Sequence, residues 1–293
     1  MIPIISLLRP QQWVKNLVVF MPPFFGAVMS DAVIWLRCIV AFCCFCLASG
    51  AVYCLNDVMD RESDRKHPHR CNRPVASGRV SVSSALTIGV ICGIGALVIA
   101  FWGMEYCRTY AVTIVAAYML LNIAYCLRLK QVAVLDVFIV SSGYVLRLFI
   151  GGVACGVVLS PWIVLVTFLF TMFLTMAKRR SDVVLRESVA GHSGRRSTQS
   201  YTLAFVNAVL GILATATIVC YMIYTVTPDV TARLGSPYVY GTSVFVLFGL
   251  LRYLQLAIVD GAGDNPVRLM LTDYPLLLCA AGWLISFVVI IYF

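Results

Sequence analysis

The apolar run over residues 33–54 ends in a polar stretch that reads Asn56-Asp57-Val58-Met59-Asp60-Arg61-Glu62-Ser63-Asp64. The run is long enough to cross a bilayer as a helix, which takes about 20 residues. Four of the chain's 13 carboxylates lie in the polar stretch that follows. Such a concentration of acid at the end of a membrane-spanning segment requires a physical reason.

The rest of the chain has the same apolar character. Of 293 residues, 61% are hydrophobic and 12% are charged, whereas a soluble domain has roughly 25% charged residues. With a mean hydropathy of +0.93, the chain is not an ordinary soluble enzyme. We predict an all-α polytopic membrane protein, residues 1–293 forming a single integral-membrane domain with nine transmembrane helices. The nine apolar runs lie near residues 16–30, 33–54, 82–102, 109–127, 134–154, 161–177, 201–225, 237–256 and 274–293.

The basic residues indicate how the spans are oriented. Eighteen of the 22 lie on the side of the N-terminus, and only Arg37, Arg108 and Arg233 lie on the other side. Because positive charge is retained in the cytoplasm, the N-terminus is predicted to be cytoplasmic, with two polar loops near residues 57–80 and 178–200. The positive charge follows this topology and no nucleic-acid fold is recognisable, so the predicted partner is the lipid bilayer and not nucleic acid.

The spacing of the acids points to a metal site. If the helix continues past residue 54, Asp57, Asp60 and Asp64 lie within an arc of roughly 60° on one face. Carboxylates without an accompanying His or Cys set suit Mg²⁺, whose coordination shell substrate phosphates complete. The alternative is a solvated loop whose acids and bases neutralise each other. Basic residues that would pair with such phosphates follow at once: Arg65, Lys66, Arg70, Arg73 and Arg79.

One cation, Arg147, lies inside the predicted span over residues 134–154. An unpaired cation there is costly, so Arg147 should face a cavity or a partner. Asp136 lies on the same helical face but about 16 Å away along the axis, too far for direct contact. Three roles stay open for Arg147: substrate binding, a structural contact with another helix, or the lining of a transport pathway.

The stretch Asn56–Asp64 matches the NDxxDxxxD signature of the UbiA-type intramembrane polyprenyltransferase superfamily. The predicted arrangement of nine spans, with long cytoplasmic loops after even-numbered spans, also resembles that superfamily. The resemblance implies a helical bundle around a central cavity that opens sideways to lipid. It also implies Mg²⁺-bound pyrophosphate at the cytoplasmic mouth. Asp57, Asp60 and Asp64 would hold Mg²⁺, and Asn56 would position them.

The second acidic motif of these prenyltransferases, after the sixth span, is replaced here. Residues 177–187 read AKRRSDVVLRE, with a basic triplet where acid is expected. This triplet and the segments 9–16, 125–130 and 135–147 are similar to the decaprenyl-phosphate phosphoribosyltransferase branch. Members of that branch transfer 5-phosphoribose from 5-phosphoribosyl 1-diphosphate (PRPP) to a polyprenyl phosphate and release pyrophosphate.

The resemblance to this branch implies roles for further residues. Lys66 and Arg73 would neutralise charge on the pyrophosphate, while Tyr125, Asp136 and Arg147 would bind the ribose and its 5-phosphate. The substrate site would also include Asn16 and Asp182. The lipid phosphate would be held by some of Lys15, Lys130, Lys178, Arg179 and Arg180.

Two other functions are weighed against phosphoribosyl transfer. A prenyltransferase would move a polyprenyl group from its diphosphate to an aromatic or other small acceptor, but the missing acidic second motif argues against it. In a transporter, Asp136 and Arg147 would line the pathway. An acidic cluster at the membrane mouth, away from the midplane, argues against that function.

Overall fold

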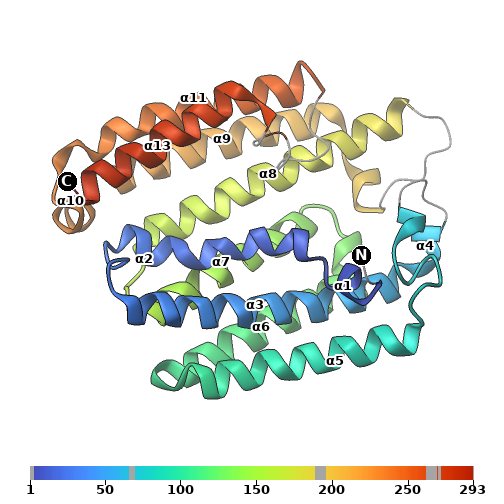
Figure 1. Cartoon of the computed structure of the whole chain (residues 1–293). Helices are drawn as coiled ribbons and strands as arrows, with labels where there is room; N and C mark the ends of the chain where they lie inside the picture. The colour runs from blue at the N-terminus through green and yellow to red at the C-terminus, as the bar shows by residue number, and fades with distance from the viewer. Residues whose placement is uncertain (1–2, 66–69, 189–195, 262–268, 270–271, 293) are drawn as a thin grey trace. The chain divides into compact units, whose positions relative to one another are not determined.

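The computed structural model describes residues 3–65, 70–188, 196–261, 269 and 272–292, and the elements in these ranges are helices (Figure 1). Hydrocarbon offers no hydrogen-bond partner to the backbone, so spanning segments satisfy their own amides as helices. Within the described part, eight helices are long and apolar enough to cross a membrane, which confirms the all-α prediction. They are Ala32–Met59, Val82–Gly103, Glu105–Leu127, Leu135–Cys155, Pro161–Glu187, Leu203–Val226, Pro237–Ile258 and Tyr274–Ile291.

The first predicted span, near residues 16–30, does not form one long α-helix. It is divided between a 3₁₀ helix, η1 (Pro10–Phe20), and a short α-helix, α2 (Met21–Phe25). Pro22 and Pro23 lie in the first turn of α2, where proline is tolerated because the first amides of a helix have no intrahelical acceptor. The count of nine spans and the cytoplasmic N-terminus therefore stay predictions.

The helices group into two compact units. Unit 1 comprises Met1–Lys130 and Gly143–Val158, and unit 2 comprises Gln131–Ser142 and Leu159–Phe293. One helix, α7 (Leu135–Cys155), contributes residues to both.

Unit 1 is organised around α3 (Ala32–Met59), which packs lengthwise against α5 (Val82–Val98) (Figure 1). The helix α6 (Arg108–Leu127) and η1 also pack on α3. Small buried side chains on α3, such as Ala41, Cys44 and Ala48, let these neighbours approach closely. The shorter elements of unit 1 are α1 (Pro3–Leu8), α4 (Arg61–Arg65), η2 (Arg70–Asn72), the π-helix η3 (Ile99–Gly103) and η4 (Glu105–Cys107). The residues of η5 (Leu129–Gln131) are divided between the two units, since unit 1 ends at Lys130.

The 3₁₀ helix η1 lies directly against the part of α7 that belongs to unit 1. A Cβ atom added at Gly151 would collide with the backbone carbonyl of Val19, so only glycine permits this approach. A 3₁₀ helix of 11 residues is long for its type, since runs beyond three or four residues are uncommon. Tertiary contacts must therefore hold η1 in place.

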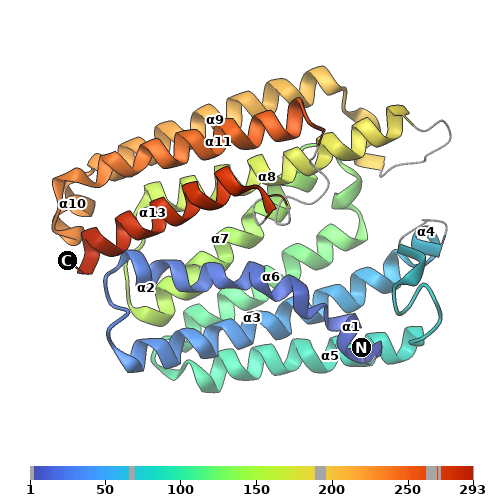
Figure 2. The same cartoon turned by 45° about the horizontal axis from the view of Figure 1, so that its top comes forward.

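Unit 2 is formed by α8 (Pro161–Ser188), α9 (Leu203–Val226), α11 (Ser243–Ile258) and α13 (Tyr274–Tyr292). In this unit α8 packs on α9, and α11 packs on α9 and α13 (Figure 2). Thr202 begins α9 by accepting the backbone N–H of Phe205 at 3.2 Å, a capping bond that satisfies one free amide. The short elements are η6 (Arg196–Ser200), α10 (Pro228–Leu234) and η7 (Pro237–Thr242).

Candidate active site

The acidic stretch lies at the C-terminal end of α3, where the helix is interrupted for one residue. Helix α3 ends at Met59, Asp60 has φ −92° and ψ 1°, and α4 begins at Arg61. The expectation of a continuous helix through Asp64 is therefore corrected. Two helical hydrogen bonds cross the break, from Asp60 N–H to the carbonyl of Asn56 (2.9 Å) and from Asp64 N–H to that of Asp60 (2.8 Å). They keep the acids close together despite the interruption.

Two of the three acids are joined by one base. Arg73 Nη1 lies 2.6 Å from Asp64 Oδ2 and 3.7 Å from Asp57 Oδ1. Arg9 also contacts Asp57 Oδ1, and the Lys130 ammonium contacts Asp60 Oδ1. Each acid therefore has a basic partner in unit 1.

Arg9 had no predicted site role; only its place at the start of the segment 9–16 signalled it. It adopts the left-handed backbone conformation (φ 51°, ψ 62°), which is uncommon for a residue other than glycine. Its guanidinium lies 5.1 Å from the centre of the Tyr53 ring, one helical turn before Asp57. Strained backbone of this kind persists where surrounding contacts enforce it, and such positions cluster at functional sites.

The acidic cluster fits a hard divalent cation. Asp57 is 1% exposed, and its Oδ2 has no hydrogen-bond partner among the residues that the structure describes, although Oδ1 meets two arginines. A buried carboxylate oxygen left without a partner is costly unless a ligand satisfies it. Among the described residues no group of three or more His, Cys, Asp and Glu side chains is already arranged around a metal position, because bases separate the acids. Lys66, predicted to help neutralise the pyrophosphate, lies outside the described residues.

Arg147, the intramembrane cation, is held by three neutral acceptors. Its Nε donates to Asn16 Oδ1 (2.7 Å), its Nη1 to the carbonyl of Gly143 (2.7 Å), and its Nη2 to Tyr118 Oη (2.9 Å). The Tyr118 ring also lies 4.8 Å from the guanidinium carbon. No carboxylate of the described residues forms an ion pair with Arg147. Tyr118 was not foreseen, because nothing in the sequence links it to residue 147.

Asn16 connects this cation to α3. Its amide nitrogen lies 3.2 Å from Cys46 Sγ and 3.4 Å from Ser49 Oγ. Ser49, Tyr53 and Asp57 are spaced by four residues and share one face of α3. Asn16 therefore contacts one end of this face and Arg9 the other. The predicted binding residues Lys15, on η1, and Tyr125, on α6, are half-buried in the same unit.

A second charged network lies in unit 2. Asp136 is fully buried and accepts Arg179 Nε at 2.7 Å and the Tyr201 hydroxyl at 3.2 Å. Arg179 Nη1 also reaches Asp182 Oδ2 at 3.2 Å. The Tyr201 oxygen accepts the N–H of Val134 (2.5 Å), whose φ of 67° is strained for a β-branched residue. Burial raises the pKa of Tyr201 to about 12.

The basic triplet divides between two environments. Lys178 is exposed, whereas Arg179 and Arg180 are buried. Arg180 donates to Asn207 Oδ1 (2.9 Å) and to the carbonyls of Ala257 (2.5 Å) and Ile258 (3.2 Å). The two arginines thus tie α8 to the rest of unit 2.

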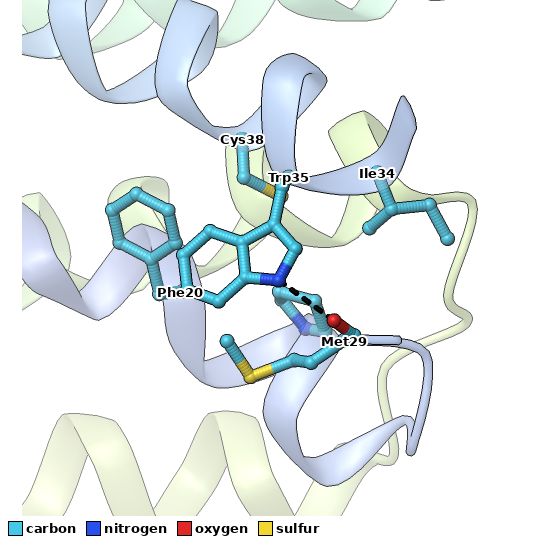
Figure 3. A pocket seen from close by; sticks show the side chains of 6 residues that line it. Phe20, Met29, Ile34, Trp35 and Cys38 are labelled. Atoms are coloured by element: carbon cyan, nitrogen blue, oxygen red, sulfur yellow. Dashed lines mark hydrogen bonds between the residues drawn. The ribbon is translucent and has the colours of Figure 1, made fainter. Parts of the chain in front are cut away.

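A small apolar pocket lies at the other end of α3 (Figure 3). The indole nitrogen of Trp35 donates to the carbonyl of Met29 (2.7 Å) at this place. Helical rise puts Trp35 about 33 Å from Asp57 along α3, so the pocket is not part of the acidic site. It has about 140 Å³ of empty volume and is lined by Phe20, Pro23, Met29, Ile34, Trp35 and Cys38.

Comparison with known proteins agrees with this fold. Residues 19–259 match the model of the UbiA prenyltransferase family, and the chain belongs to that family. Family membership and the eight apolar helices make it a multi-pass membrane protein.

Within the family, the chain is similar to two curated bacterial proteins. It is 33% identical to the decaprenyl-phosphate phosphoribosyltransferase of Mycolicibacterium smegmatis, over 99% of this chain and 92% of that protein. It is 32% identical to the Corynebacterium glutamicum protein of the same name, over 98% of this chain and 86% of that protein. The resemblance to this branch is therefore confirmed.

Solved structures share the fold. A UbiA homologue from Archaeoglobus fulgidus bound to DMAPP and Mg²⁺ has a TM-score of 0.72 at 16% identity, covering 98% of each chain. The apo UbiA homologue from Aeropyrum pernix has a TM-score of 0.69 at 15% identity, over 95% of this chain and 98% of that one. At these identities the likeness concerns the fold alone.

Proposed function

We propose that this protein transfers 5-phosphoribose from PRPP to a polyprenyl phosphate and releases pyrophosphate. The observation that carries the proposal is the 33% identity, over 99% of the chain, to a curated decaprenyl-phosphate phosphoribosyltransferase. The absence of a second acidic motif from residues 177–187 agrees with it. The reaction would take place on the cytoplasmic side of a bacterial inner membrane, in accordance with the distribution of basic residues.

The donor diphosphate is assigned to the end of α3. A Mg²⁺ ion held by Asp57, Asp60 and Asp64 would neutralise charge on the departing pyrophosphate. The support is the all-oxygen donor set, the buried Oδ2 of Asp57, and the Mg²⁺ bound with DMAPP in the Archaeoglobus fulgidus protein. Asn56 lies next to the first acid and would position it.

Protein bases bind the phosphate oxygens around this centre. Arg9, Arg73 and Lys130 already contact the acids, and a guanidinium matches a phosphate with two parallel hydrogen bonds. Lys66 is assigned to the same task from the sequence alone.

The acceptor attacks without a strong base. A phosphate monoester is already anionic, so its oxygen attacks the anomeric carbon of the ribose directly. The new bond joins that oxygen to the carbon while the bond to pyrophosphate breaks, and the pyrophosphate leaves with the electron pair. Attack from the opposite side inverts the anomeric centre. The candidate ligand of the lipid phosphate is Lys15 in unit 1, and the exposed Lys178 is a separate candidate in unit 2.

The residues first assigned to the ribose have different surroundings. Arg147 and Asp136 are each enclosed by protein partners, so we assign them to positioning the helices that carry the site. Tyr125 keeps its assignment to the sugar. Asn16 is assigned to holding η1, through its contacts with Arg147 and Ser49.

A donor-choice experiment tests the proposal against prenyl transfer. Purified protein in detergent with Mg²⁺ is given PRPP and polyprenyl phosphate in one reaction, and polyprenyl diphosphate and an aromatic acceptor in another. Release of pyrophosphate is followed in both. We expect release only in the first reaction. Release only in the second would leave the family intact and overturn the proposed substrates.

A further inference from the structure

Each of the acids at the end of α3 contacts a basic side chain. Arg9 and Arg73 contact Asp57, Arg73 contacts Asp64, and Lys130 contacts Asp60. Three carboxylates thus face three cationic side chains. A divalent cation that entered this cluster alone would leave it with an excess of positive charge in a partly buried place, which is electrostatically costly.

At two of the three acids the contacting base is more exposed than the acid, whereas at Asp60 the order is reversed, with the acid 20% exposed and Lys130 14% exposed. The side chains of Asp57 and Asp64 are 1% and 2% exposed, whereas those of Arg9 and Arg73 are 23% and 25% exposed. An ion from solvent therefore meets the arginines before it meets these carboxylates. For the ion to reach the acids, at least one guanidinium has to move to another anion.

We propose that Arg9, Arg73 and Lys130 close the acidic cluster to free divalent cation, so that the metal enters only together with a diphosphate. The diphosphate oxygens replace the carboxylates as partners of these bases, and the metal replaces the bases as the partner of the carboxylates. The negative charge of the diphosphate thus offsets the charge that the metal brings into the cluster. The inference rests on the proposed function, because it assumes that the cluster is the metal–diphosphate site.

Two unsatisfied polar atoms support this exchange. Asp57 Oδ2 is a buried acceptor without a donor, and Arg61 Nε is a buried donor without an acceptor among the described residues. Arg61 directly follows Asp60, so both atoms belong to the acidic stretch. A buried polar group that stays unsatisfied is costly. A metal would coordinate Asp57 Oδ2, and a phosphate oxygen would accept a hydrogen bond from Arg61 Nε. Metal and diphosphate together would therefore satisfy both atoms, whereas either ligand alone would leave one of them unsatisfied.

The test measures metal binding instead of turnover. Full-length protein in detergent is titrated with Mn²⁺, with and without inorganic pyrophosphate, and free Mn²⁺ is quantified by its paramagnetic resonance signal. We expect pyrophosphate to tighten Mn²⁺ binding to the wild type by at least about tenfold, within the usual range of coupling between two ligands. Arg73→Gln should bind Mn²⁺ alone at least about tenfold more tightly than the wild type and lose most of the coupling.

Matched variants separate charge from fold. Arg73→Lys keeps the positive charge and should retain the weak binding of Mn²⁺ alone. Arg108→Gln removes a basic residue of unit 1 whose guanidinium contacts the carbonyl of Phe101 and the carboxylate of Glu105, and it should behave as the wild type. Should Arg73→Gln not fold, Lys130→Gln makes the same test at Asp60.

Different results overturn the two proposals. Mn²⁺ binding that depends on Asp57 but is equally tight with and without pyrophosphate would overturn the closed cluster and leave the metal site standing. Undiminished Mn²⁺ binding by Asp57→Asn would instead overturn the metal assignment in the proposed function. A wild type that binds no Mn²⁺ even with pyrophosphate would overturn both.

Discussion

Arg147 on α7 donates a hydrogen bond of 2.7 Å to the amide oxygen of Asn16 on η1. Asn16 also approaches Ser49 on α3, so the two side chains join three elements of unit 1 inside the apolar core. The same 3₁₀ helix begins next to Arg9, which contacts Asp57. A buried cation thus helps to hold the segment that directly follows Arg9.

Arg147→Met should destabilise the protein by about 3 kcal/mol, because Asn16 and Tyr118 would each lose a charged donor while buried. Thermal unfolding in detergent measures the change. In Arg147→Met combined with Asn16→Leu, both polar partners are removed, and part of the stability should return. A single variant as stable as the wild type would show that the contact contributes nothing to the fold.

The buried ion pair of unit 2 should show strong coupling. Asp136→Asn and Arg179→Gln are predicted to interact in a double-mutant cycle by about 0.5–3 kcal/mol of unfolding free energy. Asp182→Asn removes the other acid that contacts Arg179, but its side chain is 30% exposed, so its effect should stay within about 1 kcal/mol. If Asp136→Asn and Asp182→Asn lowered the free energy of unfolding equally, burial of the Asp136–Arg179 pair would not be what makes it stabilising.

The Tyr201 hydroxyl makes stability depend on alkaline pH. Burial raises its pKa from 10.0 to about 12. The folded state therefore favours the neutral phenol, and this contribution is complete below pH 10 and lost as the pH rises to about 12. Between these values the melting temperature of the wild type should fall more steeply than that of Tyr201→Phe. Parallel curves for the two proteins would refute the assignment.

Removing divalent metal should stop turnover. We expect a chelator to abolish pyrophosphate release from PRPP and added Mg²⁺ to restore it, because the carboxylates of α3 offer only oxygen ligands. Asp64→Asn should raise the Mg²⁺ concentration needed for half-maximal rate, whereas Glu62→Gln, at a side chain that is 76% exposed, should leave it unchanged. Turnover that survives chelation would exclude the metal from the reaction.

Hydropathy predicted eight of the helices because lipid forces a spanning segment to satisfy its own backbone. It did not foresee the form of residues 16–30, where Pro22 and Pro23 restrict the chain and η1 takes 3₁₀ geometry. The apolar character of this segment is real, but hydropathy does not report helix type. The acid motif was likewise visible in the sequence, although the one-residue break at Asp60 was not.

The partners of the acids were harder to predict, because they come from distant parts of the chain. Arg9 reaches Asp57 across 48 residues, and Lys130 reaches Asp60 across 70. No periodicity encodes such contacts. The sequence did indicate that Arg147 needs partners, but it could not identify Tyr118 and Asn16, since neutral acceptors carry no charge signal.

The central claim, that the acids at the end of α3 activate PRPP, is tested most directly by one comparison of product formation. Wild type, Asp57→Asn and Glu62→Gln are given Mg²⁺, PRPP and polyprenyl phosphate, and the lipid-linked phosphoribose is quantified by mass spectrometry. Glu62 is the matched control, because it lies in the same acidic stretch but its side chain is 76% exposed and, within the described part of the chain, forms an ion pair with Arg65 alone. We predict a loss of at least about 100-fold for Asp57→Asn and a rate near that of the wild type for Glu62→Gln. Undiminished Mg²⁺-dependent product formation by Asp57→Asn would contradict the claim.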